Sequence, residues 1–340
     1  MPIATGALGW TCRWFISDRT EINVTLRAPV SPIAAGEPVV IEKRFATPDV
    51  VSRYQKYLGI DVSQDLAGVE EILLCRGRES NLRFFWPPHL AGGAAFYENL
   101  MRNPHYYLGD KWEYGAAIEE LSPGSRVLEI GSGKGDFLAH LTQRGHDATG
   151  LEINDRGIEI ARQAGLDIRK GVIEEFAQSV RSPYDAVCAF QVLEHVMTPS
   201  SFLEAAIACL RDDGLLILAV PNGDGVFASL DVALDMPPHH MLRWNSAAFQ
   251  YLTKRFPLAL HDLRCEPISP LHLGMLATAC FNHLSQPQQG WAAFRRKAVA
   301  TLVSKYWQRY FSELRIAGHT LLATFRKMQP SAPGSHFVTP

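Results

Sequence analysis

The regular alternation of short apolar runs and helical patterns between Arg126 and Val220 restricts the fold of this chain more than any other feature. Strands at this pace, separated by helices, are typical of βαβ units and a parallel sheet. We therefore predict an α/β fold with a doubly wound, mostly parallel sheet. The expected strands are 126–130, 147–153, 166–170, 184–190 and 214–220, and the expected helices are 136–144, 155–164, 174–180 and 200–210.

The flanking regions predict further elements. Segments 258–264 and 319–325 are expected to close the sheet as an antiparallel hairpin, which brings it to seven strands, and a helical insert is expected at 269–315 between them. Residues 1–105 are expected to be a small α+β accessory module. The main domain would then span 106–328, followed by a disordered tail at 329–340.

A glycine-rich bend follows the first strand of this pattern. Gly131, Ser132, Gly133 and Gly135 stand between a predicted strand and a predicted helix. Glycines there let the chain turn tightly and let backbone N–H groups approach a ligand at the positive end of a helix. The strand-to-helix context makes this loop a candidate nucleotide-binding site.

Two acidic residues narrow the choice of ligand. Glu152 ends the second strand, where a carboxylate accepts hydrogen bonds from ribose hydroxyls. Glu129 lies two residues before the first glycine, where it would repel a pyrophosphate but attract an ammonium group. A ligand with adenosine at one end and a cationic amino acid at the other satisfies both carboxylates, which points to S-adenosylmethionine (SAM).

The same residues carry a family resemblance. VLEIGSGKGDF (127–137), TGLEIN (149–154), YDAVCAFQVLEHV (184–196) and LRDDGLLILAVPN (210–222) resemble the successive motifs of class I SAM-dependent methyltransferases. The Glu-His pair after the fourth strand is most similar to the group that contains the ubiquinone-biosynthesis O-methyltransferases (methyltransferase types 11, 12 and 23).

The resemblance implies a set of cofactor-binding residues. The glycine loop would wrap the methionine portion, Glu152 would hold the ribose, and the residues that close the fourth strand would line the cofactor. Where family members have Asp-Ala after the third strand, this chain has Val172 and Ile173, so apolar contacts would hold the adenine. The expected cofactor-binding residues are Glu129, Gly131, Ser132, Gly133, Gly135, Phe137, Glu152, Ile153, Ile173, Phe190 and Gln191.

Relatives with a metal-assisted site tend to carry Glu-x-x-Glu-His, and this chain has Gln191 in place of the first glutamate. We therefore expect no metal ion at Glu194 and His195. The hydroxyl of an acceptor would instead lose its proton to a histidine, the side chain best tuned to accept a proton near neutral pH. His195 and His240 are the candidate general bases, and His239 lies beside His240 in the loop after the fifth strand.

Composition limits the partners. The 33 basic and 35 acidic residues leave a net charge of -2, so nucleic acid is a poor acceptor. The six cysteines form no C-x-x-C pair, and no secretory signal or membrane span is recognisable, which predicts a cytoplasmic protein. The basic, aromatic segment 291–314 is open to three interpretations: a helix on a membrane surface, a lid, or a dimer contact.

Three functions remain open from the sequence. The first is SAM-dependent methylation, most simply of a hydroxyl, on a small-molecule acceptor or one linked to a glycan or a lipid. The second is a dinucleotide-dependent oxidoreductase, which Glu129 and the early Gly135 disfavour. The third is a non-catalytic protein that binds SAM. The sequence does not indicate the oligomeric state.

Overall fold

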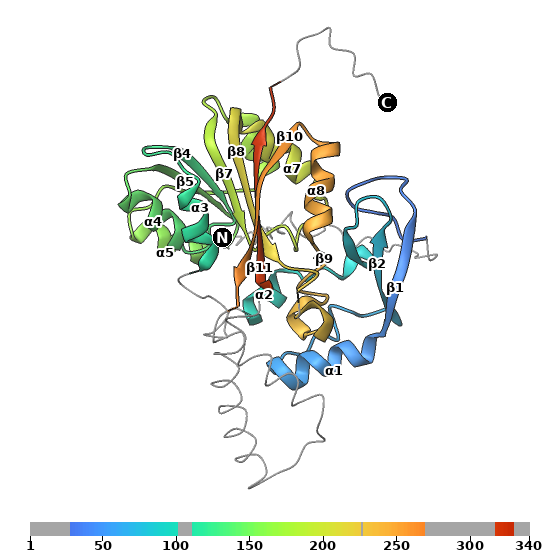
Figure 1. Ribbon diagram of the computed structural model, residues 1–340. Helices are drawn as coiled ribbons and strands as arrows, with labels where there is room; N and C mark the ends of the chain where they lie inside the picture. Colours follow the sequence, from blue (N-terminus) through green and yellow to red (C-terminus); the bar gives the residue numbers. More distant parts are fainter. Residues whose placement is uncertain (1–27, 101–110, 226, 269–316, 330–340) are drawn as a thin grey trace, which may run out of the picture.

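The computed structural model describes residues 28–100, 111–225, 227–268 and 317–329, and arranges them around two β-sheets (Figure 1). The larger sheet has seven strands in the order β10-β11-β8-β7-β4-β5-β6. Its strands are β4 (Arg126–Ile130), β5 (Asp147–Glu152), β6 (Ile168–Lys170), β7 (Tyr184–Phe190), β8 (Leu210–Pro221), β10 (Leu258–Pro267) and β11 (Ala317–Lys327).

Strand β4 pairs in parallel with β5 and β7, and β7 pairs in parallel with β8. Strand β11 is antiparallel to both of its neighbours, β8 and β10. The helices that surround this sheet are α3 (Trp112–Glu119), α4 (Asp136–Gln143), α5 (Asp155–Gln163), α6 (Ile173–Phe176), α7 (Pro199–Ala208) and α8 (Ser246–Arg255). The predicted doubly wound, mostly parallel seven-stranded sheet is confirmed.

Alternate residues of the central strands face two different cores. In β7, Ala186 and Cys188 pack with α3 and α4, whereas Val187 and Ala189 pack with α7 and α8. A strand covered by helices on both faces must be apolar on both, because its side chains point alternately to opposite sides. This requirement explains the nearly continuous hydrophobic run of β7.

The smaller sheet has the order β1-β2-β3-β9 and consists of β1 (Val39–Ala46), β2 (Glu71–Gly77), β3 (Arg83–Trp86) and β9 (Leu242–Arg243). Helices α1 (Thr47–Leu58) and α2 (Ala94–Leu100) belong to the same part of the chain. Strand β9 comes from far along the sequence, and Phe84 and Leu128 belong to one hydrophobic core. The two halves therefore share a sheet and a core, and the domain boundaries at 105 and 106 stay a prediction.

Some elements differ from their expected bounds. Strand β8 begins at Leu210, four residues before the predicted strand. Asp213, within these first residues, has a positive φ of 59°, and the chain continues as an extended strand after it. The helix expected at 174–180 is the short α6 followed by a 3₁₀ turn at Ala177–Ser179. The beginning of the predicted accessory module (residues 1–27), the expected insert 269–315 and the tail beyond Gln329 lie outside the described residues.

The 231–243 segment contains a buried ion pair, and both members of that pair also contact the smaller sheet. The Arg243 guanidinium bonds to Asp231 at 3.3 Å and lies over the Phe85 ring, 5.0 Å from its centre. Lys43 of β1 also pairs with Asp231. Arg243 and Asp231 are only 7% and 6% exposed, so each charge depends on the other for compensation.

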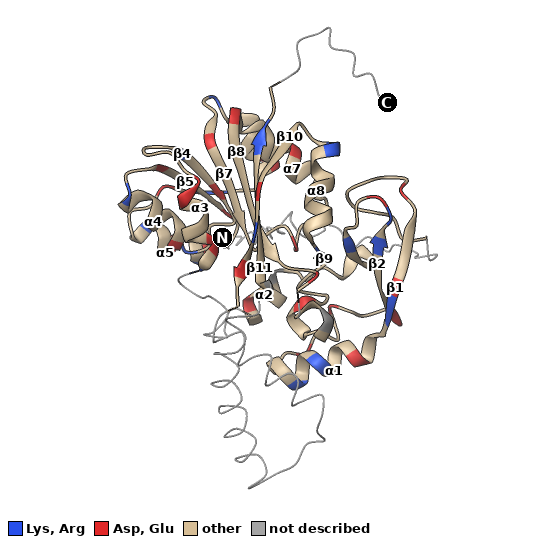
Figure 2. Ribbon diagram, in the orientation of Figure 1, with Lys and Arg blue, Asp and Glu red and all other residues tan. Residues whose placement is uncertain are grey.

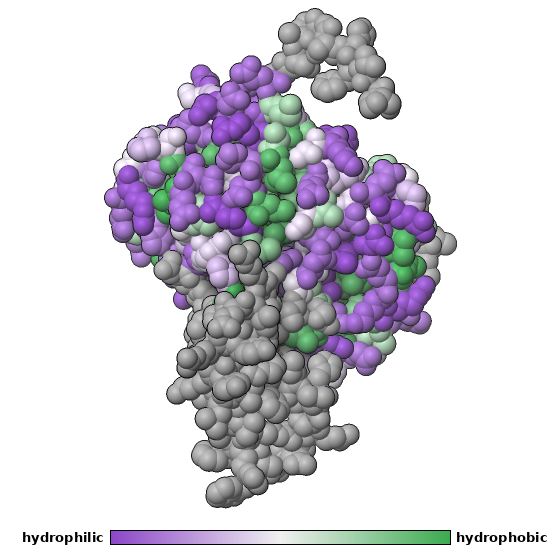
Figure 3. All heavy atoms as spheres, viewed as in Figure 1, coloured by the Kyte–Doolittle hydropathy of each residue, from purple (hydrophilic) through white to green (hydrophobic). Residues whose placement is uncertain are grey.

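The described surface carries charges of both signs, and blue and red segments alternate around the molecule in Figure 2. Hydrophilic side chains cover most of the face shown in Figure 3, with a narrow hydrophobic strip in the region where Figure 1 places β11. Within the described ranges, every helix is too short or too polar to span a lipid bilayer.

We expect Asp231→Asn to lower the free energy of unfolding by about 3 kcal/mol, because it leaves the buried Arg243 charge uncompensated. The matched control is Glu71→Gln, which breaks the exposed Arg44–Glu71 pair and is expected to cost at most about 1 kcal/mol. Urea denaturation of both variants measures the difference. Equal losses would show that the buried Arg243–Asp231 pair contributes no more to stability than the exposed Arg44–Glu71 pair.

Candidate active site

The glycine loop between β4 and α4 has the backbone geometry that only glycine adopts easily. Gly131 and Gly135 have φ angles of 73° and 87°. A Cβ on Gly131 would lie 2.5 Å from a methyl group of Val192, and one on Gly135 would lie 2.5 Å from Leu166. The loop is thus held against the end of β7 on one side and the chain before β6 on the other.

Glu152 ties this loop to the end of β5. Its side chain is 9% exposed and accepts three backbone hydrogen bonds, from Gly133 at 2.7 Å, Ile153 at 2.7 Å and Asn154 at 2.8 Å. A carboxylate has about four acceptor positions, so three internal bonds leave capacity for a ligand hydroxyl. Glu152 therefore fixes the shape of the loop and keeps an acceptor position open.

Glu129 is a buried carboxylate with an unsatisfied hydrogen-bond acceptor. It is 2% exposed, and its Oε2 has no hydrogen-bond partner among the described residues. Burial raises its pKa well above the usual value, the carboxylates of Glu152 and Asp136 raise it further, and the Lys111 ammonium opposes them. An anion here is costly unless a cation or hydrogen-bond donor approaches it.

Residues before α3 complete this side of the site. The Gln191 amide donates to Glu113 at 3.1 Å, and burial is the largest cause of the raised pKa of Glu113. The Lys111 charge lowers the pKa values of Glu113, Glu129 and Glu194 alike, so one ammonium influences all three carboxylates. Trp112, in the same segment, packs against the hydrophobic core around Tyr114.

The remaining predicted cofactor residues differ in exposure. Phe137 and Phe190 are buried together, with ring centres 4.8 Å apart, and Tyr114 packs on both. Ile173 is fully buried at the start of α6, whereas Ile153 is half-buried after β5. Ser132 is buried, and its backbone N–H donates to Leu151 at 3.0 Å. Phe137 and Ile173 are therefore core residues that support the site from the interior of the protein.

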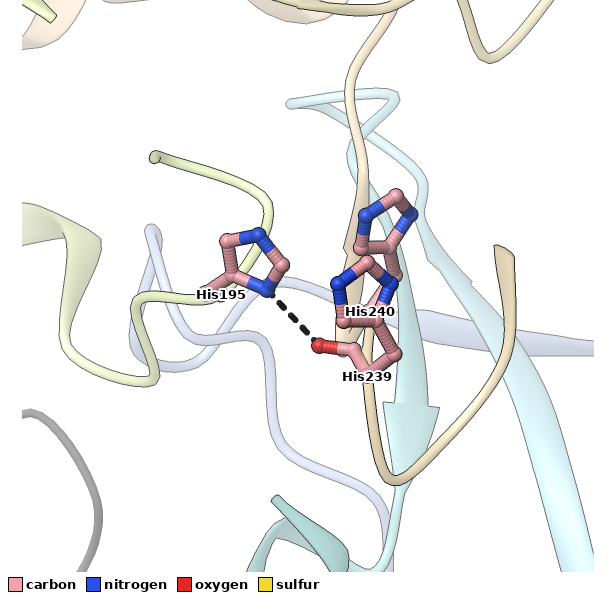
Figure 4. A group of neighbouring side chains, drawn as sticks. All are labelled: His195, His239 and His240. Atoms are coloured by element: carbon pink, nitrogen blue, oxygen red, sulfur yellow. Dashed lines mark hydrogen bonds between the residues drawn. The ribbon is translucent and has the colours of Figure 1, made fainter. Parts of the chain in front are cut away.

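Three histidines from two distant segments meet beside the end of β7 (Figure 4). The His195 ring lies 4.7 Å from that of His239 and 4.8 Å from that of His240, centre to centre. His239 and His240 stack on each other at 4.3 Å. The structure thus brings the two candidate general bases, His195 and His240, together with His239.

Backbone hydrogen bonds hold the two segments together. The carbonyl of Glu194 accepts from Met241 and from Leu242, each at 3.0 Å, and the Trp244 indole donates to the carbonyl of Leu193 at 3.3 Å. Tyr97 of α2 donates to the carbonyl of His239 at 3.2 Å and lies 3.1 Å from His195 Nδ1. The turn after β7 and the 236–242 loop are therefore held side by side. We call these two segments, with His195, His239 and His240, the histidine wall.

Burial controls the charges of this wall. It lowers the pKa of His195 to about 4 and those of His239 and His240 well below the usual value. It also raises the pKa of Glu194 to about 8. The histidines are consequently neutral at physiological pH, the form that can accept a proton or bind a metal.

Sequence reasoning did not assign roles to Glu113, Tyr97 or Asp235. Their contacts with Gln191, His195 and His240 join elements far apart in the chain, so no local spacing announces them. Gly157 was missed too, although a glycine inside a helix is a visible signal: a Cβ there would lie 2.8 Å from the carbonyl oxygen of Gly133.

Comparison with known proteins finds similarity to methyltransferases. Residues 102–264 match the family model of a methyltransferase domain. Among curated proteins, the ubiquinone biosynthesis O-methyltransferase of Bordetella avium is 32% identical over 114 residues, which cover 31% of this chain and 47% of that protein. That of Hahella chejuensis is 29% identical over 146 residues, covering 41% of this chain and 56% of that protein.

The chain thus spans about half the length of the curated relatives that it matches. Among solved structures, a SAM-dependent methyltransferase from Archaeoglobus fulgidus aligns with a TM-score of 0.48 and 15% identity, over 68% of this chain and all of that one. The family match coincides with the glycine loop and the strands that hold Glu129, Glu152 and Gln191. Residues 102–264 are therefore similar to a methyltransferase domain.

Proposed function

We propose that this protein transfers a methyl group from SAM to a hydroxyl of a small-molecule acceptor, or of one linked to a glycan or a lipid. The single observation that carries the cofactor assignment is the buried Glu129 carboxylate, whose Oε2 has no partner within the described part of the chain. An ammonium group beside the glycine loop would supply that partner. The pyrophosphate of a dinucleotide would instead meet a second negative charge.

The residues present suit SAM from end to end. Glu129 would bind its ammonium group, the backbone of Gly131–Gly135 would enclose its methionine portion, and Glu152 would accept from its ribose. The half-buried Ile153, supported by the buried Ile173, offers the adenine an apolar surface. When bound, SAM supplies an electrophilic methyl group on its sulfonium.

The acceptor would lie along the histidine wall. His195 donates its Nδ1 hydrogen to the carbonyl of His239 at 2.8 Å, and His240 donates its own to Asp235 at 3.1 Å. Each ring is thereby fixed in the tautomer whose Nε2 carries the lone pair. His195 or His240 would then accept the proton of the acceptor hydroxyl as general base.

The mixed charge of the described surface supports a small neutral or weakly charged acceptor over a nucleic acid. The curated relatives are named for ubiquinone biosynthesis, and a ring hydroxyl of a quinone precursor is one acceptor of this chemistry. A cytoplasmic location rests on the scattered cysteines. A membrane-surface contact through 291–314 concerns residues outside the described ranges.

We expect Glu129→Gln to weaken SAM binding at least about tenfold, because the ammonium loses a charged partner worth about 1.5–3 kcal/mol. The ligand-free variant should be no less stable than the wild type, since a buried uncompensated charge is removed. Calorimetric SAM titration and thermal melting measure the two effects. The control is Glu159→Gln on the exposed face of α5. An unchanged SAM affinity would refute the ammonium assignment.

Gly157→Ala is expected to displace the loop, because the new methyl group would press on the carbonyl of Gly133 at 2.8 Å. SAM affinity should fall about tenfold, as for the loss of one hydrogen bond of about 1.4 kcal/mol. Gly115→Ala is the matched control: it also lies in a helix, is exposed, and has nothing within 4 Å of an added Cβ. Similar affinities in both variants would contradict the role of this loop.

The reaction itself is tested with methyl-labelled SAM, the full chain and a metabolite extract, followed by mass spectrometry of labelled products. We expect a labelled hydroxyl-bearing compound, and a rate lowered at least about a hundredfold by replacing the general base. SAM binding without a labelled product would indicate a non-catalytic binding protein. Binding of a nicotinamide dinucleotide in place of SAM would indicate an oxidoreductase.

A further inference from the structure

The histidine wall has a second property that proton transfer does not require. One ligand atom from each of His195, His239 and His240 lies within 4.8 Å of the other two. The Nε2 atoms of His195 and His240 lie 3.8 Å and 3.9 Å from the same oxygen, Oε1 of Glu194. These distances exceed a hydrogen bond, so Glu194 lies beside His195 and His240 without bonding directly to either ring.

Each imidazole is oriented by an acceptor behind it. His195 Nδ1 donates to the carbonyl of His239 at 2.8 Å, and His239 Nδ1 donates to the carbonyl of Leu234 at 2.8 Å. His240 Nδ1 donates to the carboxylate of Asp235 at 3.1 Å. A carbonyl or carboxylate behind each ring is the arrangement that fixes the tautomer of metal-binding histidines.

The fourth member is a buried acid. Glu194 is 1% exposed, and neither of its carboxylate oxygens has a hydrogen-bond partner among the described residues. Three neutral rings cannot compensate a buried negative charge, and a proton alone leaves both oxygens without a hydrogen-bond partner. A divalent cation compensates the carboxylate and uses the ring lone pairs at once.

We propose that His195, His239 and His240, together with Glu194, bind one divalent transition-metal ion, with zinc as the ion that suits them best. Three imidazoles and one carboxylate form a nitrogen-rich donor set of the kind that zinc and other late first-row ions prefer, whereas magnesium prefers oxygen ligands. Two nitrogens on one zinc ion lie about 3.3 Å apart. Ring rotations that shorten the widest separation by about 1.5 Å complete the site.

This site departs from the sequence-based expectation of no metal, which rested on Gln191. The structure turns Gln191 toward Glu113 and supplies His239 and His240 from the other side. While the ion is bound through their Nε2 atoms, neither His195 nor His240 can also serve as the general base. A bound divalent ion would itself lower the pKa of a hydroxyl that it ligates, a consequence that rests on the proposed methyl transfer.

The experiment uses the full chain. Metal content of the purified protein is measured by mass spectrometry, and the protein is then stripped with a chelator and titrated calorimetrically with Zn²⁺ and with Mg²⁺. We expect about one zinc per chain and an affinity at least about a hundredfold higher for Zn²⁺ than for Mg²⁺. Failure to bind Zn²⁺, or equal affinities for both ions, would overturn the site.

Variants locate the ion. His239→Ala is expected to weaken Zn²⁺ binding at least about a hundredfold, and Asp235→Asn, behind His240, about ten- to a hundredfold. His261→Ala, in the exposed part of β10, is the matched control and should bind like the wild type. Equal zinc affinity in His239→Ala and His261→Ala would overturn the assignment.

Two further readouts keep the result interpretable. If His239→Ala fails to fold, the visible spectrum of the wild type loaded with Co²⁺ decides the question. Imidazole ligation gives intense bands that a hexa-aqua ion lacks, so a spectrum like that of the free ion would refute the site.

A SAM titration in parallel separates the metal site from the methyltransferase function. Zinc binding without SAM binding overturns only the methyltransferase function, and SAM binding without zinc binding overturns only the metal site.

Discussion

A carboxylate buried without a partner is the constraint on which the active site depends. Glu129 lies in the centre of the parallel sheet, and its pKa is raised well above normal mainly by burial. A protein that keeps such a group gives up stability, unless a ligand compensates it. The glycine loop, Glu152 and Lys111 all surround this position, so the local structure is organised to receive a charged ligand.

Parallel topology explains why the site lies where it does. The carboxyl ends of β4, β5 and β7 lie at the same end of the sheet, and they carry Glu129, Glu152 and Gln191 there. The contacts of Asp231 with Lys43 and of Arg243 with Phe85 hold the 231–243 segment against the smaller sheet. His239 and His240 of that segment lie beside His195, so the smaller sheet helps to position the three histidines.

The sequence predicted the elements whose signal is local. Short apolar runs marked β4, β5 and β7, and the glycines marked the loop, because these patterns follow from burial and backbone geometry within a few residues. Strand β9 was not predicted, since two residues carry no periodicity. The contact of Gln191 with Glu113 and the meeting of His195 with His239 and His240 depend on segments that pack together only in the folded chain.

The most direct measurement of the central claim is a crystal structure of this chain with S-adenosylhomocysteine. The account predicts the amino group of this ligand within hydrogen-bond distance of Glu129 and its ribose hydroxyls on Glu152. A crevice that excludes the compound, or a bound pose in which neither carboxylate touches it, would contradict the account.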